Sequence, residues 1–159
     1  MQTLYLSAYQ SHLWNRLLAE WLHLHHAPEQ LSSVELRMGP HPLPRKLDDA
    51  ALATWRELEL PYPSARLTWD EQAEWAPALR RVLDAEGLEL ADIRLRGPRQ
   101  PFFSKGLRVA AVIPQGTMHQ DEPDEKHHGR RKLCLGFDLP PGAYATMFIK
   151  RITSLEPTH

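Results

Sequence analysis

Apolar residues recur every three or four positions between Ser7 and about His25, at Tyr9, Leu13, Leu17, Leu18, Trp21 and Leu22. This spacing is typical of the buried stripe of an amphipathic helix. We expect Ser7 to cap the N-terminus of the helix, because its hydroxyl can accept a hydrogen bond from a backbone N–H of the first turn. Pro28 cannot continue a regular helix, so the helix should end before it.

The next segment is rich in proline and carries little apolar pattern. Four prolines fall between residues 28 and 44, and only residues 34–38 form a strand-like apolar run. We therefore expect mostly connecting chain there. A short helix capped by Asp48 or Asp49 is predicted to run to Glu57, and the prolines of residues 60–63 then predict an extended stretch.

A second helical region is predicted downstream. Thr68 and Glu71 have the spacing of a capping box, in which each side chain satisfies a free backbone N–H at the start of a helix. The region should run to about Glu86 and stop at Gly87. Pro77 either kinks this helix or is the first residue of a new one.

The C-terminal third predicts strands. Residues 107–113 and 132–137 are short, apolar runs, and we expect the polar residues 114–131 between them to form a mobile, solvated loop. Residues 145–151 fit either a helix or a strand by local propensity.

Composition limits the class of protein. The chain has 159 residues, of which 42% are hydrophobic and 25% charged, with a formal net charge of -1. These values are typical of a soluble globular protein, and any nucleic-acid contact must be local. The only cysteine, Cys134, lies in an apolar run and is expected to be a buried thiol. Because neither a secretory leader nor a membrane span is visible, we expect a cytoplasmic protein.

Two segments resemble a known family. Residues 4–15 read LYLSAYQSHLWN and residues 137–146 read FDLPPGAYAT. They are similar to the YLSAxQSxLFN helix and the closing F-x-LPxGSYAT motif of the TruD family of tRNA pseudouridine synthases. Residues 102–108, FFSKGLR, resemble the basic stretch of that family. The chain departs from the pattern at Trp14, where Phe is common, at Ala143, where Ser is common, and at 150–151, where many relatives carry Arg-Glu.

The resemblance implies an α+β fold. Residues 1–112 would form most of the family's TRUD insertion module, a mixed and largely helical unit. Residues 113–159 would be the C-terminal piece of the catalytic domain and contribute a strand and a terminal element to its sheet. That piece would carry exposed strand edges, so the lone chain is expected to dimerise, swap elements or bind the upstream half of the same enzyme.

The implied activity is isomerisation of a D-arm uridine in tRNA to pseudouridine, without metal or organic cofactor. The family's catalytic Asp lies in a KDxxAxT segment and an NYFGxQRFG segment helps to build its pocket, and neither occurs here. We expect both upstream, so this chain has no catalytic residue and should be inactive by itself. The alternative is a noncatalytic RNA-binding or interaction module derived from the same family. A scaffold without RNA contact is a third reading.

The resemblance implies that Tyr144 packs against the target base. Pseudouridine synthesis withdraws a uridine from its stack, and an aromatic ring can hold the detached base. Gly142 would form the tight turn that lets backbone approach the ligand. On the residues alone, Tyr144 could equally cap a hydrophobic core.

A basic stretch is the candidate RNA-contact surface. Between residues 93 and 108 there are five cations and no carboxylate, namely Arg94, Arg96, Arg99, Lys105 and Arg108. Such groups pair with phosphates, and the interleaved Phe102 and Phe103 could stack on bases. Alternatively, the cations are solvated or form internal ion pairs and the phenylalanines fill the core. Residues 130–132 form a second, weaker basic patch.

Other constellations are set aside. His23 and His26 have i, i+3 spacing, but no third metal ligand is evident, so no metal site is predicted. Asp92 is expected to pair with nearby arginines and Asp138 to bond the backbone of the following turn. Neither is nominated as a catalytic acid or base.

Overall fold

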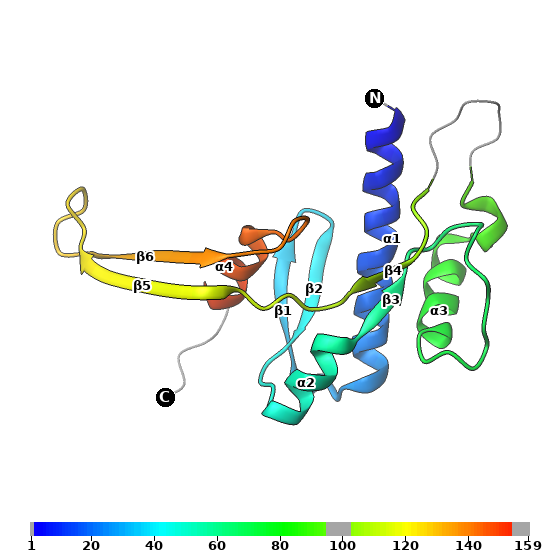
Figure 1. Cartoon of the computed structure of the whole chain (residues 1–159), viewed down its shortest axis with the longest axis horizontal. Coiled ribbons are helices and arrows are strands. Elements are labelled where there is room, and N and C mark those ends of the chain that lie inside the picture. Colours follow the sequence, from blue (N-terminus) through cyan, green and yellow to red (C-terminus); the bar gives the residue numbers. More distant parts are fainter. Residues whose placement is uncertain (1, 95–102, 154–159) are drawn as a thin grey trace.

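A computed structural model describes residues 2–94 and 103–153 (Figure 1). Within these ranges it contains four α-helices and three two-stranded antiparallel sheets, which confirms the α+β prediction. The helices are α1 (Gln2–His25), α2 (Asp49–Glu57), α3 (Ala76–Glu86) and α4 (Ala145–Thr153). The strands pair as β1 (Leu31–Leu36) with β2 (Gly39–Pro44), β3 (Glu59–Pro61) with β4 (Leu107–Val109), and β5 (Gln115–Pro123) with β6 (Arg131–Asp138). None of the helices in the described ranges has the length and apolar character needed to cross a bilayer.

Helix α1 is the centre of the hydrophobic core. Its predicted stripe is buried except for Tyr9, which is 38% exposed, and Leu13 and Leu17 are fully inaccessible. Leu79 and Val82 of α3 pack into the same cluster. The expected cap at Ser7 is wrong, because the helix already begins at Gln2. No glycine or proline interrupts residues 2–6, so helical hydrogen bonding continues through Ser7, and its preference for a cap position is overridden.

The ends of α2 and α3 test the predicted helix caps and stops. Asp48 caps α2 as predicted, since its carboxylate accepts from Ala51 N at 2.7 Å. The capping box at residues 68–71 is wrong, because α3 begins only at Ala76, after a series of turns. Pro77 lies in its first turn, which is one of the two predicted alternatives. The helix ends as predicted at Gly87, whose φ of +64° is left-handed.

The proline-rich segment is a β-hairpin rather than a connector. Strand β2 contains Pro40, Pro42 and Pro44, all at even positions, and its register pairs Ser33 with Pro42. Arg45 N donates to Gln30 O at 2.8 Å, so the odd-numbered backbone N–H groups of β2 face β1 and the proline nitrogens face away from it. Alternate prolines are therefore compatible with this edge strand.

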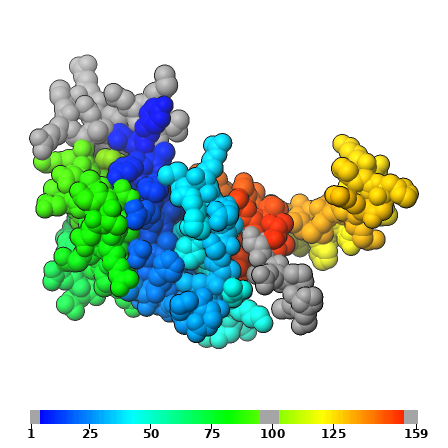
Figure 2. Space-filling model, turned by 180° about the vertical axis from the view of Figure 1, so that it is seen from behind, coloured from blue at the N-terminus to red at the C-terminus, as the bar shows by residue number. Residues whose placement is uncertain are grey.

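Strands β5 and β6 form a ribbon that projects away from the core (Figures 1 and 2). Residues 114–131 were expected to be a loop, but residues 115–123 pair with β6. The segment lacks an apolar alternation because both faces of the ribbon are largely solvent-exposed. Strand β6 confirms the prediction for residues 132–137, whereas the predicted strand at 107–113 is confirmed only over β4. Cys134 is exposed rather than buried, because nothing in the described ranges covers this part of the ribbon.

Candidate nucleic-acid interface

A tight turn connects β6 to α4. Ala143 N donates to Pro140 O at 3.1 Å, which closes a four-residue turn with Pro141 and Gly142 at its centre. Gly142 has a φ of +86°, a conformation that a side chain disfavours and that is typical of the third residue of a type II turn. The predicted turn is therefore present. Residues 145–151, which the sequence left open, belong to the helix α4.

Tyr144 lies between this turn and the first residue of α4. Its carbonyl accepts from Met147 N at 3.0 Å, so its backbone is fixed by the start of the helix. The side chain is 69% exposed, which excludes the alternative that it caps the core in this structure. Its ring is available for stacking from solvent. The assignment of Tyr144 to a uridine site remains a prediction.

Helix α4 is held against the β1–β2 hairpin by polar contacts. Lys150 Nζ donates to the carbonyl of Glu35, and the Arg151 guanidinium donates to Ser32 Oγ at 3.3 Å and to Arg45 O at 2.8 Å. Figure 2 shows the C-terminal helix in contact with the hairpin. Partial burial lowers the pKa of Arg151 from its ordinary value. On the ribbon side, the ring of Phe148 meets that of Phe137 at a centroid distance of 4.6 Å.

Both described ends of the basic stretch contact the same short segment, residues 62–65. Ile93 O accepts from Ala65 N at 3.1 Å, and Gly106 O accepts from Tyr62 N at 3.0 Å. Arg94 and Lys105 adjoin these contacts and are both exposed. They are therefore available to bind phosphate. Arg96, Arg99 and Phe102 lie outside the described residues.

Arg108 has a different environment. It is half-buried in β4, and its guanidinium carbon lies 4.5 Å from the ring centroid of Trp14 on α1. A cation over an indole face is stabilised by the ring quadrupole. Phe103 is partly buried against the hydrophobic core, as the structural alternative for this residue predicted. No contact between these residues and Tyr144 is observed within the part of the chain that the structure describes.

The motif of residues 4–15 contains a buried polar clamp that sequence reasoning missed. Gln10 is only 3% exposed, and its amide donates to Pro63 O at 3.2 Å and to Ser104 O at 2.7 Å. Ser104 N in turn donates to Gln10 Oε1 at 2.9 Å. The signal was present, because Gln10 lies three and seven positions before Leu13 and Leu17, on the buried face of the helix.

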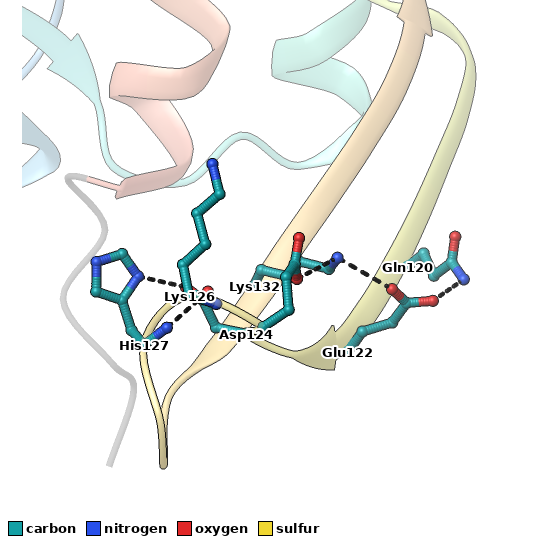
Figure 3. Close-up of polar contacts among 7 residues, drawn as sticks. Gln120, Glu122, Asp124, Lys126, His127 and Lys132 are labelled. Carbon is teal, nitrogen blue, oxygen red and sulfur yellow. Dashed lines mark hydrogen bonds and ion pairs between the residues drawn. The ribbon is translucent and has the colours of Figure 1, made fainter.

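The tip of the β5–β6 ribbon is an ion-paired surface (Figure 3). Asp124 accepts from Lys126 N at 2.8 Å and faces His127 Nδ1 at 3.0 Å, and these contacts lower the pKa of its carboxyl group. Lys132 lies 2.7 Å from a carboxylate oxygen of Glu125 and 3.5 Å from one of Glu122. Together with the Arg131–Asp121 pair at 2.9 Å, these contacts neutralise two members of the weaker basic patch.

Two surface depressions lie away from Tyr144. One is lined by Trp69, Arg80 and Arg81 beside Glu71 and Asp84, and the Arg80 guanidinium carbon lies 5.0 Å from the Trp69 ring centroid. The other is lined by Trp21 and three glutamates, Glu57, Glu59 and Glu74.

Asp92, which was expected to pair with arginines, instead accepts from the backbone N–H of Glu89 at 2.9 Å. Among the described residues, no three His, Cys, Asp or Glu side chains are grouped to hold a metal ion.

Comparison with known proteins identifies distant relatives. No protein-family model matches the chain. It is 24% identical over 151 residues to the "Probable tRNA pseudouridine synthase D 2" of Methanocaldococcus jannaschii. The aligned region covers 95% of this chain and 35% of that protein. It is 28% identical over 158 residues to the "tRNA pseudouridine synthase D" of Aquifex aeolicus, with 96% and 37% covered. The "Probable tRNA pseudouridine synthase D 1" of Methanococcus maripaludis is 23% identical over 161 residues, with 98% and 39% covered.

The chain is therefore a distant homologue of the TruD-family tRNA pseudouridine synthases over about 95% of its length. It spans only 35% to 39% of the length of these relatives.

Proposed function

We propose that this chain is the C-terminal part of a tRNA pseudouridine synthase and that it binds RNA and positions the target base. The observation that carries the proposal is the relation to these synthases along nearly the whole chain, combined with an exposed aromatic ring on the glycine turn. In this proposal, residues 1–112 form most of the insertion module and residues 113–159 are a piece of the catalytic domain. The substrate is a D-arm uridine of tRNA, and the setting is the cytoplasm.

Tyr144 stacks on the uridine after it leaves the helical stack. Base–aromatic stacking contributes about 1 to 3 kcal/mol per base, and the open surface around the ring allows a base to approach. Gly142 keeps the preceding turn free of a side chain, so the backbone can lie close to the ligand. Arg94 and Lys105, with Arg96 and Arg99, contact phosphates of the same RNA. Arg108 contributes positive charge while its guanidinium rests on Trp14.

The catalytic aspartate comes from polypeptide outside this chain, so the chain alone is inactive. The partner that supplies it binds the β5–β6 ribbon, because each of these strands has one described neighbour and can offer its other edge to a further strand. An isolated two-stranded ribbon is only marginally stable in water. If this edge instead pairs with a second copy, light scattering will show a dimer of the purified chain.

A chimera tests the function. This chain replaces the matching 37% of the Aquifex aeolicus synthase, and pseudouridine formed in tRNA is quantified by chromatography of the digested nucleosides. We expect activity in the chimera and none in this chain alone. Binding of tRNA without pseudouridine formation, in a folded chimera, would favour the noncatalytic RNA-binding module.

The chimera also tests Tyr144. Tyr144→Ala should lower the turnover number about 5- to 150-fold, the range that corresponds to 1 to 3 kcal/mol, with a much smaller change in tRNA affinity. Tyr5→Ala is a matched control, because Tyr5 is 70% exposed on α1, close to the 69% of Tyr144. Equal turnover in the two variants would remove Tyr144 from the uridine site.

A further inference from the structure

Four cations lie along the contact between α4 and the β1–β2 hairpin. Arg151 and Lys150 come from the helix, while Arg45 and Lys46 directly follow β2. The Arg151 guanidinium bonds the carbonyl of Arg45 at 2.8 Å, although 106 positions separate the two residues. Lys150 bonds the carbonyl of Glu35, three residues beyond Ser32 on β1, so the four cations are spread along the hairpin. The grouping exists only because α4 docks on this hairpin. We call it the α4–hairpin cluster.

These four cations have no carboxylate partner in the described residues. Lys150, Arg151 and Arg45 donate to backbone carbonyls or, in the case of Arg151, also to a serine hydroxyl. The Lys46 side chain is exposed and makes no hydrogen bond or ion pair in the described part of the chain. At the ribbon tip, by contrast, Arg131 and Lys132 face acidic side chains. Glu35 supplies the carbonyl that Lys150 bonds, but no carboxylate of the described residues lies within ion-pair distance of the four cations, so their charge remains available to an external anion.

The hydrogen-bonding capacity of the cluster is also incompletely used. A lysine ammonium has three N–H donors and an arginine guanidinium has five. Lys150 has one observed acceptor and Arg151 has two, and Arg45 uses only its Nε, toward Leu31 O at 2.8 Å. Each side chain keeps donors that can bind the oxygens of a phosphate.

From this arrangement we infer that the α4–hairpin cluster binds the phosphodiester backbone of the RNA whose base Tyr144 stacks on. The inference rests on the proposed function and adds a second phosphate contact to it, separate from the basic stretch of residues 93–108. Arg151 lies seven positions after Tyr144, which corresponds to about 10 Å along the axis of α4. A stacked strand rises roughly 3.4 Å per nucleotide, so about three nucleotides cover this length.

The test measures tRNA binding by the 159-residue chain at several salt concentrations. The double variant Lys46→Gln/Lys150→Gln removes two charges of the cluster, and Lys46→Gln alone leaves every observed contact of α4 intact. The slope of log affinity against log salt should fall by about 1.4 to 1.8 in the double variant and by about 0.7 to 0.9 in the single variant. The single variant keeps the test valid if loss of the Lys150 contact releases α4.

The matched control is Arg56→Gln/Lys126→Gln, which removes two exposed charges, one on α2 and one at the ribbon tip. It should leave the salt slope near that of the unmodified chain. An equal fall in this control would mean that only net charge matters, which overturns the inference. If the unmodified chain binds tRNA and the cluster variants keep its full slope, the inference is wrong while the proposed function stands. If the unmodified chain shows no salt-dependent binding of tRNA, both fail.

Discussion

Gln10 offers a quantitative test of how the core positions the basic stretch. Its side chain takes part in three hydrogen bonds, two from its amide nitrogen to Pro63 O and Ser104 O and one from Ser104 N to its Oε1. A Gln10→Leu substitution keeps a similar volume but removes all three. With a net contribution of roughly 0.5 to 1.5 kcal/mol per bond, the free energy of unfolding should fall by about 2 to 4 kcal/mol.

Urea unfolding followed by tryptophan fluorescence measures this change. Gln72→Ala is the control, because the Gln72 side chain is exposed and makes no hydrogen bond in the described residues. The control should stay within about 0.5 kcal/mol of the unmodified chain. A loss below about 1 kcal/mol in Gln10→Leu would refute the reasoning, since it would show that water replaces these bonds without cost.

The variant Gln10→Glu adds a pH signature. The new carboxylate would face the carbonyl oxygens of Pro63 and Ser104, whereas its protonated form can donate to one of them. The folded state should therefore raise the pKa of the introduced carboxyl group above its unfolded value of about 4.3. Between the pKa of the unfolded state and the higher pKa of the folded state, the folded state binds more protons than the unfolded state. The free energy of unfolding should therefore fall as pH rises through this range. An unfolding free energy that rises with pH relative to Gln10→Leu would contradict this environment.

Two further predictions concern the turn and the hairpin. Gly142→Ala should destabilise the turn by about 1 to 3 kcal/mol. The cause is the φ of +86° alone, since no atom lies within 4 Å of the added Cβ. We expect faster amide hydrogen exchange in α4, and unchanged exchange would refute the prediction. Burial and nearby His23 lower the pKa of His41 below 6.5, so the unfolded state binds protons more readily and the free energy of unfolding should fall as pH decreases through 6.5. Urea titrations between about pH 5 and 7.5 should show a smaller pH slope for His41→Asn, and an unchanged slope would exclude His41 as the cause.

The sequence predicted the elements whose signals are local. The apolar period of α1 predicts its burial because the same residues that repeat along the chain fill the core. The Asp48 cap and the Gly87 stop were also correct, because each depends on one side chain and the adjacent backbone. Strand β5 was missed, although β6 was predicted, because β5 is held by backbone hydrogen bonds and ion pairs between exposed strands. An exposed strand of this kind leaves no apolar alternation in the sequence.

The candidate interface was predictable only in part. The turn at Gly142 follows from Pro141 and Gly142 themselves, whereas the exposure of Tyr144 depends on what covers it. The α4–hairpin cluster has no sequence signature, because Arg151 is fixed by a backbone carbonyl and a serine hydroxyl far along the chain. Backbone acceptors occur at every residue. Tertiary packing therefore decides which of these carbonyls the Arg151 guanidinium bonds.

The tie between Arg151 and Ser32 joins positions 119 residues apart, and this separation affects how the chain acquires its structure during synthesis. The α1–α3 nucleus can condense while the later residues are still being translated. The intervening body is then already folded, so only the chain that is still unstructured adds to the entropic cost of closure before α4 gains its anchor. A ribosome-bound nascent chain should consequently carry a folded α1–α3 body before α4 is secured.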